Sequence, residues 1–326
     1  MTKGTSTRRK NRLPGYLYGN FDPGDQDKLM ITYKRDATHD YSLSAACGVV
    51  YEGDIHFFGG GVFPNNNFNT QHFVIQTQRS GKMVKMTKKK DLAVGFRSPS
   101  CSTFAITEHR FPWSSKNIVI ICFTLQFNPF INKPKSCYSF DGNINYIGDT
   151  KFDHWGAPMT KYKRNLITIG CYSVKTELLQ SNKNGSFIWS EVESDFRIER
   201  FKDLFGHSLV TIPASDIKEE YALLIGGTNL RMDQISNSIF KFNGTWFQFG
   251  TWNKPRRYFS SIYWNGAVYF IGGEYGDSED DQKTKMEIWQ VTNYQREVET
   301  SENWPELDYW KFPKLFIVED SFFPDY

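Results

Sequence analysis

The pattern of apolar and polar positions predicts a β-hairpin between Arg257 and Glu274. Two strand-length runs of aromatic and β-branched residues occur in this stretch, and Asn265-Gly266 separates them. Asn-Gly between such runs is the strongest short-range signal for a tight hairpin turn. The second run ends on Gly272-Gly273, where glycine allows a positive φ and a close approach of another backbone. Met286 to Val291 predicts a third strand, and a sheet this small needs neighbouring sheets to cover its faces.

The same pattern recurs along the chain. Apolar runs end on a glycine pair at Asp54–Gly60, Tyr221–Gly227 and Val268–Gly273, and degenerate copies lie between them at Ile118–Phe123 and Leu166–Cys171. Runs that carry an aromatic residue follow them at Gln71–Ile75, Ser136–Phe140, Gly185–Trp189 and Ser238–Phe242. A spacing of about 50 residues with a double glycine and a downstream aromatic is typical of one propeller blade per repeat. The pattern therefore predicts five units.

At these residues the sequence resembles the kelch-repeat β-propellers, over roughly residues 28 to 323 by the period of the repeat. The last two units match well, with Gly-Gly, an aromatic third strand and Arg256-Arg257-Tyr258 leading into the next blade. The second and third units depart from the family pattern, because one or both glycines are lost. The resemblance implies an all-β propeller that binds another molecule, and it does not specify the ligand.

Two strand-like runs stand outside the five units, Lys28–Lys34 near the beginning and Pro313–Asp320 near the end. Pairing strands from the two termini in one blade would close the ring and remove free sheet edges. We therefore expect a six-bladed kelch-type β-propeller closed by pairing its N- and C-terminal strands. Residues 21–326 then form a single domain, and residues 1–20 form a disordered basic tail.

Composition and charge limit the classes of function. The chain has 326 residues, 17% aromatic and 39% hydrophobic, which suffice for a packed core. A formal net charge of +3 gives no electrostatic argument for nucleic acid. No apolar run approaches ~18 residues, so no membrane-spanning helix is expected. No apolar segment typical of a signal peptide follows the basic run Arg8–Arg12. We expect a cytoplasmic or nuclear protein if the chain is complete, and an extracellular one if it is truncated at its N-terminus.

Long segments follow the second strands of the first, second and fifth units, and in a propeller they share one face. Aromatic residues in such loops either fold back onto the blade or form an exposed contact patch. Arginines near strand starts could add charged anchors, or could tie one blade to the next. The candidate binding residues are Phe63, Phe68, Phe127, Phe130, Arg231, Arg256, Arg257 and Tyr275. We expect the partner to be another protein and the chain to be a monomer.

The five cysteines contain no Cys-x-x-Cys spacing, so a zinc ribbon or a thioredoxin-like site is not supported. Their default interpretation is buried reduced thiols. Cys122 ends one predicted strand and Cys137 begins the next, so a hairpin could align them as a disulfide. Two glycosylation sequons, Asn184-Gly-Ser and Asn243-Gly-Thr, are interpreted as ordinary hairpin turns. They would matter if the protein were secreted.

No catalytic residue, cofactor or metal site is predicted. The six histidines are scattered without a paired motif, and no Gly-x-Ser-x-Gly, His-Glu-x-x-His or phosphate-binding loop occurs. The acidic run Asp277–Asp281 lacks the glycine and final glutamate of a calcium loop, and is interpreted as a solvated loop. The sequence favours a non-catalytic binding scaffold. A kelch-fold enzyme, such as a copper-radical oxidase or a lyase, and an extracellular or carbohydrate-associated propeller remain as alternatives.

Overall fold

The structure is a computed structural model. It describes residues 46–62, 67–68, 70–77, 84–108, 111–123, 135–171, 175–182, 185–192, 204–214, 219–229, 234–252, 255–264, 266–274, 287–290 and 298–300. Within these ranges the regular structure is all β-strand, so the predicted all-β class is confirmed. The tail 1–20 and the strand-like runs Lys28–Lys34 and Pro313–Asp320 lie outside the described residues.

Five four-stranded antiparallel sheets, here called sheets 1 to 5, follow one another in sequence order. Sheet 1 contains β1 (Cys47–Tyr51), β2 (Asp54–Phe58), β5 (His72–Thr77) and β6 (Val84–Lys88). Sheet 2 contains β7 (Ser100–Glu108), β8 (Phe111–Cys122), β9 (Ser136–Phe140) and β10 (Ile144–Asp149). Sheet 3 contains β11 (Met159–Tyr162), β12 (Asn165–Ile169), β13 (Thr176–Ser181) and β14 (Phe187–Val192).

Sheet 4 contains β16 (Ser208–Ile212), β17 (Tyr221–Ile225), β20 (Ser238–Phe242) and β21 (Trp246–Thr251). Sheet 5 contains β22 (Arg257–Trp264), β23 (Ala267–Glu274), β24 (Glu287–Gln290) and β25 (Val298–Thr300). A three-stranded sheet is made of β15 (Leu204–Phe205), β18 (Thr228–Asn229) and β19 (Gln234–Ile235), and β3 (Gly61–Val62) pairs with β4 (Asn67–Phe68). The five larger sheets correspond in order to the five predicted units.

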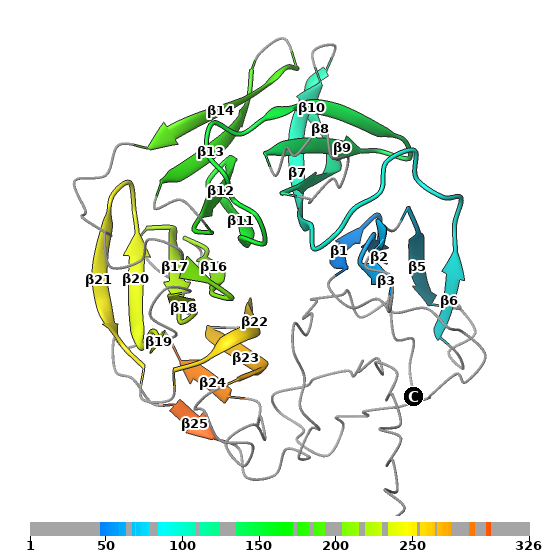
Figure 1. The fold of residues 1–326 in the computed structure, drawn as a ribbon. Helices are drawn as coiled ribbons and strands as arrows, with labels where there is room; N and C mark the ends of the chain where they lie inside the picture. The colour runs from blue at the N-terminus through cyan, green and yellow to red at the C-terminus, as the bar shows by residue number, and fades with distance from the viewer. Residues whose placement is uncertain are drawn as a thin grey trace, which may run out of the picture.

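The five sheets follow one another along an arc, and the first strand of each sheet lies on the inner side of that arc (Figure 1). First strands of neighbouring sheets contact each other, from β1 against β7 to β16 against β22. Among the described residues, one hydrophobic cluster lies between each pair of neighbouring sheets, and a smaller one is formed by residues of β22 and β23 in sheet 5. Strand β17 is buried at every position. Its alternate residues Ala222 and Leu224 face sheet 3, whereas Tyr221, Leu223 and Ile225 face sheet 5. A continuous apolar run therefore marks a strand that is covered on both faces.

One backbone contact recurs where the second strands end. The N–H of Gly60 donates to the carbonyl of Phe96 (3.1 Å), and the N–H of Gly227 donates to the carbonyl of Arg256 (2.8 Å). In sheet 3 Cys171 takes the place of the second glycine, and its N–H donates to Leu204 (2.8 Å). Each bond ties a second strand to the segment that leads into the next sheet. Cys171 has a φ of 51°, and Phe123, the first residue after β8 in sheet 2, has a φ of 65°.

One strand assignment from the sequence was wrong. The run Gly185–Trp189 was expected to be the strand that follows Leu166–Cys171, but β13 lies between them and the run falls on β14. The hairpin between Arg257 and Glu274 is confirmed, because Trp264 pairs with Ala267 around the turn. Among the described residues no helix is long and apolar enough to cross a membrane.

Candidate functional site

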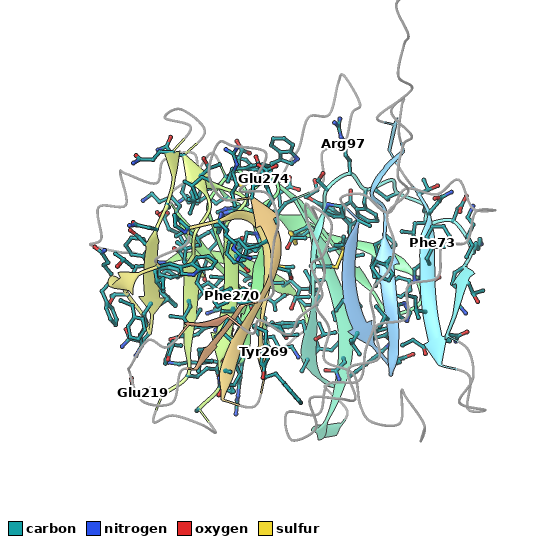
Figure 2. The ribbon with its side chains drawn as sticks, turned by 90° about the horizontal axis from the view of Figure 1, so that it is seen from below. Phe73, Arg97, Glu219, Tyr269, Phe270 and Glu274 are labelled. Carbon is teal, nitrogen blue, oxygen red and sulfur yellow. A yellow bond between two sulfur atoms is a disulfide. The ribbon has the colours of Figure 1, made fainter. Side chains whose placement is uncertain are left out.

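The sheets have two distinct ends. Arg97 and Glu274 lie near one end and Glu219 lies at the opposite end (Figure 2). We call the first the glycine end, because it contains three glycine pairs. Gly59-Gly60 follow β2, Gly226-Gly227 follow β17, and Gly272-Gly273 lie near the end of β23. We call the second the turn end. In the described register, the connections between the second and third strands begin and end at the glycine end.

Most of the predicted binding residues cannot be placed on this framework. Five of them lie outside the described residues, namely Phe63, Phe127, Phe130, Arg231 and Tyr275. Phe68 belongs to β4, which pairs with β3 directly after the glycine pair of sheet 1. The predicted contact patch therefore remains a prediction, with its flanking strands at the glycine end.

Arg256 and Arg257 are described, and their contacts differ from those of exposed anchors. Arg256 is 1% exposed, and its Nη1 donates to the carbonyl of Gly272 at 3.1 Å. Its own carbonyl accepts the N–H of Gly227, so this residue joins sheet 4 to sheet 5. The Nε of Arg257 donates to Oε2 of Glu274 at 3.0 Å across the β22–β23 pair. Of the two alternatives open for these arginines, the structural one accounts for Arg256.

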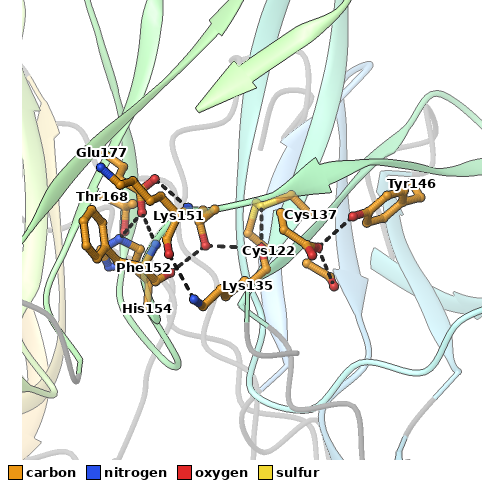
Figure 3. The surroundings of a disulfide bond; sticks show 12 residues. Cys122, Lys135, Cys137, Tyr146, Lys151, Phe152, His154, Thr168 and Glu177 are labelled. Atoms are coloured by element: carbon orange, nitrogen blue, oxygen red, sulfur yellow. Dashed lines mark hydrogen bonds and ion pairs between the residues drawn. A yellow bond between two sulfur atoms is a disulfide. The ribbon is translucent and has the colours of Figure 1, made fainter. Parts of the chain in front are cut away.

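A buried polar cluster fixes the segment between sheets 2 and 3 (Figure 3). His154 and Glu177 are both 0% exposed, and Nε2 of His154 lies 2.9 Å from Oε2 of Glu177. The Nδ1 of His154 lies 3.0 Å from the carbonyl oxygen of Gly170. Glu177 also accepts the backbone N–H groups of Lys151 (2.9 Å) and Phe152 (3.0 Å). These hydrogen bonds compensate the cost of burying a carboxylate. The sequence offers no local signal for this cluster, because His154 and Glu177 are separated by 23 positions in the sequence.

The sequence also missed a histidine pair in sheet 1. Nδ1 of His56 lies 3.0 Å from Nε2 of His72, and the ring of His72 stacks on Phe58 at 4.7 Å. The pKa of His72 is lowered to about 4, mainly by burial and in smaller part by the nearby His56 and Lys89. Burial also lowers the pKa of His56, although Asp54 opposes this shift. Both rings are therefore neutral near pH 7. In the sequence these histidines are scattered. In the β2–β5 register Phe58 pairs with His72. His56 is two positions before Phe58 on the same face of β2, so the two histidines become neighbours.

Two disulfides are present among the described cysteines. Cys122 and Cys137 are opposite each other in the β8–β9 register, with Cα atoms 4.2 Å apart, and they form the disulfide proposed from the hairpin (Figure 3). The second disulfide, Cys47–Cys101, joins β1 of sheet 1 to β7 of sheet 2, where reduced thiols were expected. Its sequence separation of 54 carries no local signal. Cys171 is a buried thiol, and burial raises its pKa.

These groups make contacts that join strands and sheets. The buried Arg256 and the His154–Glu177 pair hold segments between sheets in place. Cys47–Cys101 joins sheets 1 and 2, and Cys122–Cys137 links two strands of sheet 2. In the part of the chain that the structure describes, no three His, Cys, Asp or Glu side chains come together as a metal site. No protein-family model matches the chain, and no curated protein sequence matches it.

Proposed function

We propose that this chain is a six-bladed kelch-type β-propeller that acts as a non-catalytic scaffold for binding another protein. The observation that carries the proposal is the row of five four-stranded sheets in sequence order, with a hydrophobic cluster between each pair of neighbours. Blades of a propeller pack in this manner around a common axis. The runs Lys28–Lys34 and Pro313–Asp320 supply the strands of the sixth blade.

The proposed binding surface is the glycine end. Connections from the second to the third strand start there in every sheet, and three of them are long and carry aromatic residues. The backbone hydrogen bonds of Gly60 and Gly227 hold the starts of the connections in sheets 1 and 4 against the next sheet. Loops that are fixed at their base by a rigid scaffold are common positions for binding residues. Aromatic side chains dominate the energetics of protein interfaces.

The test begins with a partner captured from the native source and crosslinks mapped onto the chain. Replacing Phe63, Phe127 and Tyr275 singly by Ala should weaken binding to that partner by more than ~1 kcal/mol at one or more sites. The melting temperature should be unchanged. Phe247→Ala is the matched control, because Phe247 is 39% exposed on β21 and lies near the turn end. If affinity is unchanged in all three variants while stability falls, the aromatic rings belong to the core and the proposal is wrong.

The disulfides bear on the cellular compartment in which this scaffold acts. Disulfides persist in oxidising compartments and are rare in the reducing cytosol. Cys47–Cys101 and Cys122–Cys137 therefore favour an extracellular propeller over a cytoplasmic or nuclear one. Non-reducing peptide mass spectrometry on protein from the native source checks this choice. Alkylated thiols at all four positions would instead favour a cytoplasmic protein.

A further inference from the structure

The chain contains two Asn-x-Ser/Thr sequons, and they occupy equivalent places in sheets 3 and 4. Asn184-Gly-Ser lies in the turn between β13 and β14, and Asn243-Gly-Thr lies in the turn between β20 and β21. Register places both turns at the turn end, because Leu179 pairs with Leu166 and Phe242 pairs with Ala222, near the starts of β12 and β17. Both sequons therefore lie at the end of the sheets opposite the proposed binding surface.

The turn in sheet 4 leaves its sequon in solvent. Asn243, Gly244 and Thr245 are all exposed, while the flanking Phe242 and Trp246 are buried. A Cβ added at Gly244 would meet no atom within 4 Å, which shows open space around the turn. A bulky, hydrophilic group on the Asn243 amide is compatible with this fold, because no packed side chain has to move.

The turn in sheet 3 is closed by backbone hydrogen bonds, and its described residues are exposed as in sheet 4. The N–H of Asn182 donates to the carbonyl of Ser186 at 2.8 Å, and the N–H of Gly185 donates to the carbonyl of Asn182 at 2.9 Å. Gly185 and Ser186 are exposed. Asn184 itself lies outside the described residues, so the assignment at this sequon rests on the sequence and on these two exposed neighbours.

The disulfides supply the second, independent observation. Each forms when two thiols lose two electrons and two protons to a disulfide oxidant, such as the oxidoreductases of the secretory pathway. The same compartment carries out N-linked glycosylation. A chain that acquires Cys47–Cys101 and Cys122–Cys137 there also presents its sequons there.

We propose that Asn184 and Asn243 carry N-linked oligosaccharides. The co-reactant is an oligosaccharide joined to a lipid pyrophosphate. In the transfer the Asn amide nitrogen forms a bond to the anomeric carbon of the first sugar and loses a proton. The bond between that carbon and the pyrophosphate oxygen breaks, and the lipid pyrophosphate leaves with the electron pair. This assignment replaces the interpretation of the sequons as hairpin turns alone, and it rests on the extracellular setting proposed above but not on partner binding.

The proposed oligosaccharides would stand beside exposed apolar side chains. Ile188 on β14 is 49% exposed and Phe247 on β21 is 39% exposed, and each follows a sequon on the outermost strand of its sheet. An outermost strand with exposed apolar residues can pair with another chain. Sugars on the preceding turns would keep these edges apart while the glycine end stays open to a partner.

The experiment uses the full chain purified from its native source. Peptide-N-glycosidase hydrolyses a glycosylated Asn to Asp, and in heavy-oxygen water the new carboxyl carries one heavy oxygen atom. Peptide mass spectrometry should find the labelled Asp at positions 184 and 243 only after treatment with the enzyme. Labelled Asp at either position supports the proposal for that site, and an unmodified Asn overturns it for that site.

Two controls separate glycan removal from spontaneous deamidation, to which Asn-Gly is prone. One is a sample kept in heavy-oxygen water without the enzyme, and the other is the Asn265-Gly266-Ala267 peptide, which is Asn-Gly without a sequon. For full-length protein secreted from animal cells, Thr245→Ala and Ser186→Ala should each remove one glycan from the intact mass. Asn143→Gln, in the corresponding turn of sheet 2, should remove none. A partner that binds while both sequons stay unmodified would leave the scaffold standing and overturn this inference alone.

Discussion

Backbone conformation at single positions governs how neighbouring sheets are joined. Gly226 has a φ of +60°, and a Cβ at this position would lie 2.5 Å from the carbonyl oxygen of Arg256. That distance requires the segment between sheets 4 and 5 to move. Gly53 also has a positive φ, +82°, but a Cβ there would meet nothing within 4 Å. The two glycines therefore separate the cost of a positive φ from the cost of a steric contact.

The first prediction compares Gly226→Ala with Gly53→Ala. Both variants should lose about 1 kcal/mol of unfolding free energy through the positive φ. Gly226→Ala should lose roughly a further 2 kcal/mol, because displaced backbone at a packed junction is costly. Urea denaturation of the two variants and the wild type measures the difference. Equal losses would show that the close approach to Arg256 is not a constraint.

The second prediction concerns pH. The pKa of His72 is lowered from 6.5 to about 4 in the folded state, mainly because burial disfavours the charged ring. Above pH 6.5 the folded and unfolded states are both neutral at this residue, so it contributes no pH dependence. As the pH falls from 6.5 towards 4, the unfolded chain binds more protons and stability decreases. A shift of this size corresponds to about 3 kcal/mol once fully developed.

His72→Gln should therefore flatten the fall in stability between pH 6.5 and pH 4, as measured by urea denaturation at several pH values. Part of the slope should remain, because burial also lowers the pKa of His207 to about 4. Identical slopes in the variant and the wild type would contradict the assignment of this pH dependence to His72.

At the scale of elements, sequence patterns identified strands where both faces of a strand are apolar or where a turn is encoded locally. The runs that became β17 and β23 were found for this reason, and so was the Asn265-Gly266 hairpin. Strand β13 was missed because Thr176 and Glu177 interrupt its apolar pattern, although both are buried. Trp246 bonds to Thr176, and the Lys151–His154 segment satisfies Glu177. Such long-range partners leave no periodic signal in the sequence.

The same limit explains the candidate site. The Cys122–Cys137 pairing could be inferred because two consecutive strands align the residues. The Cys47–Cys101 pairing depends on contact between the first strands of different sheets, which local spacing does not encode. Arg256 was proposed as a possible anchor because the sequence shows its charge and not its burial. The His56–His72 pair required the cross-strand register.

The third prediction tests the disulfide within sheet 2. Cys122→Ser/Cys137→Ser should lose about 3 kcal/mol of unfolding free energy, as expected for a loop that closes over a sequence separation of 15. The variant should also become less sensitive to reductant than the wild type. Cys171→Ala is the control, because Cys171 forms no disulfide. Melting temperatures with and without reductant provide the measurement. No loss in the double variant would show that the cross-link does not stabilise sheet 2.

At the scale of the whole molecule, stability is distributed over interfaces between consecutive sheets. Sheet 3 shares one hydrophobic cluster with sheet 2 and another with sheet 4. The sheets at the two ends of the row need a further neighbour to cover their outer faces, because an uncovered apolar face promotes aggregation. The proposed sixth blade, built from Lys28–Lys34 and Pro313–Asp320, would supply that neighbour to both.

The most direct test of the propeller account compares two truncations of the full chain by their melting temperatures. Deleting residues 1–20 removes the predicted tail and should leave the melting temperature unchanged. Deleting residues 1–34 also removes the predicted blade strand Lys28–Lys34, so it should lower the melting temperature and promote aggregation by exposing a sheet edge. Equal melting temperatures for the two truncations would contradict closure of the ring by strands from both termini.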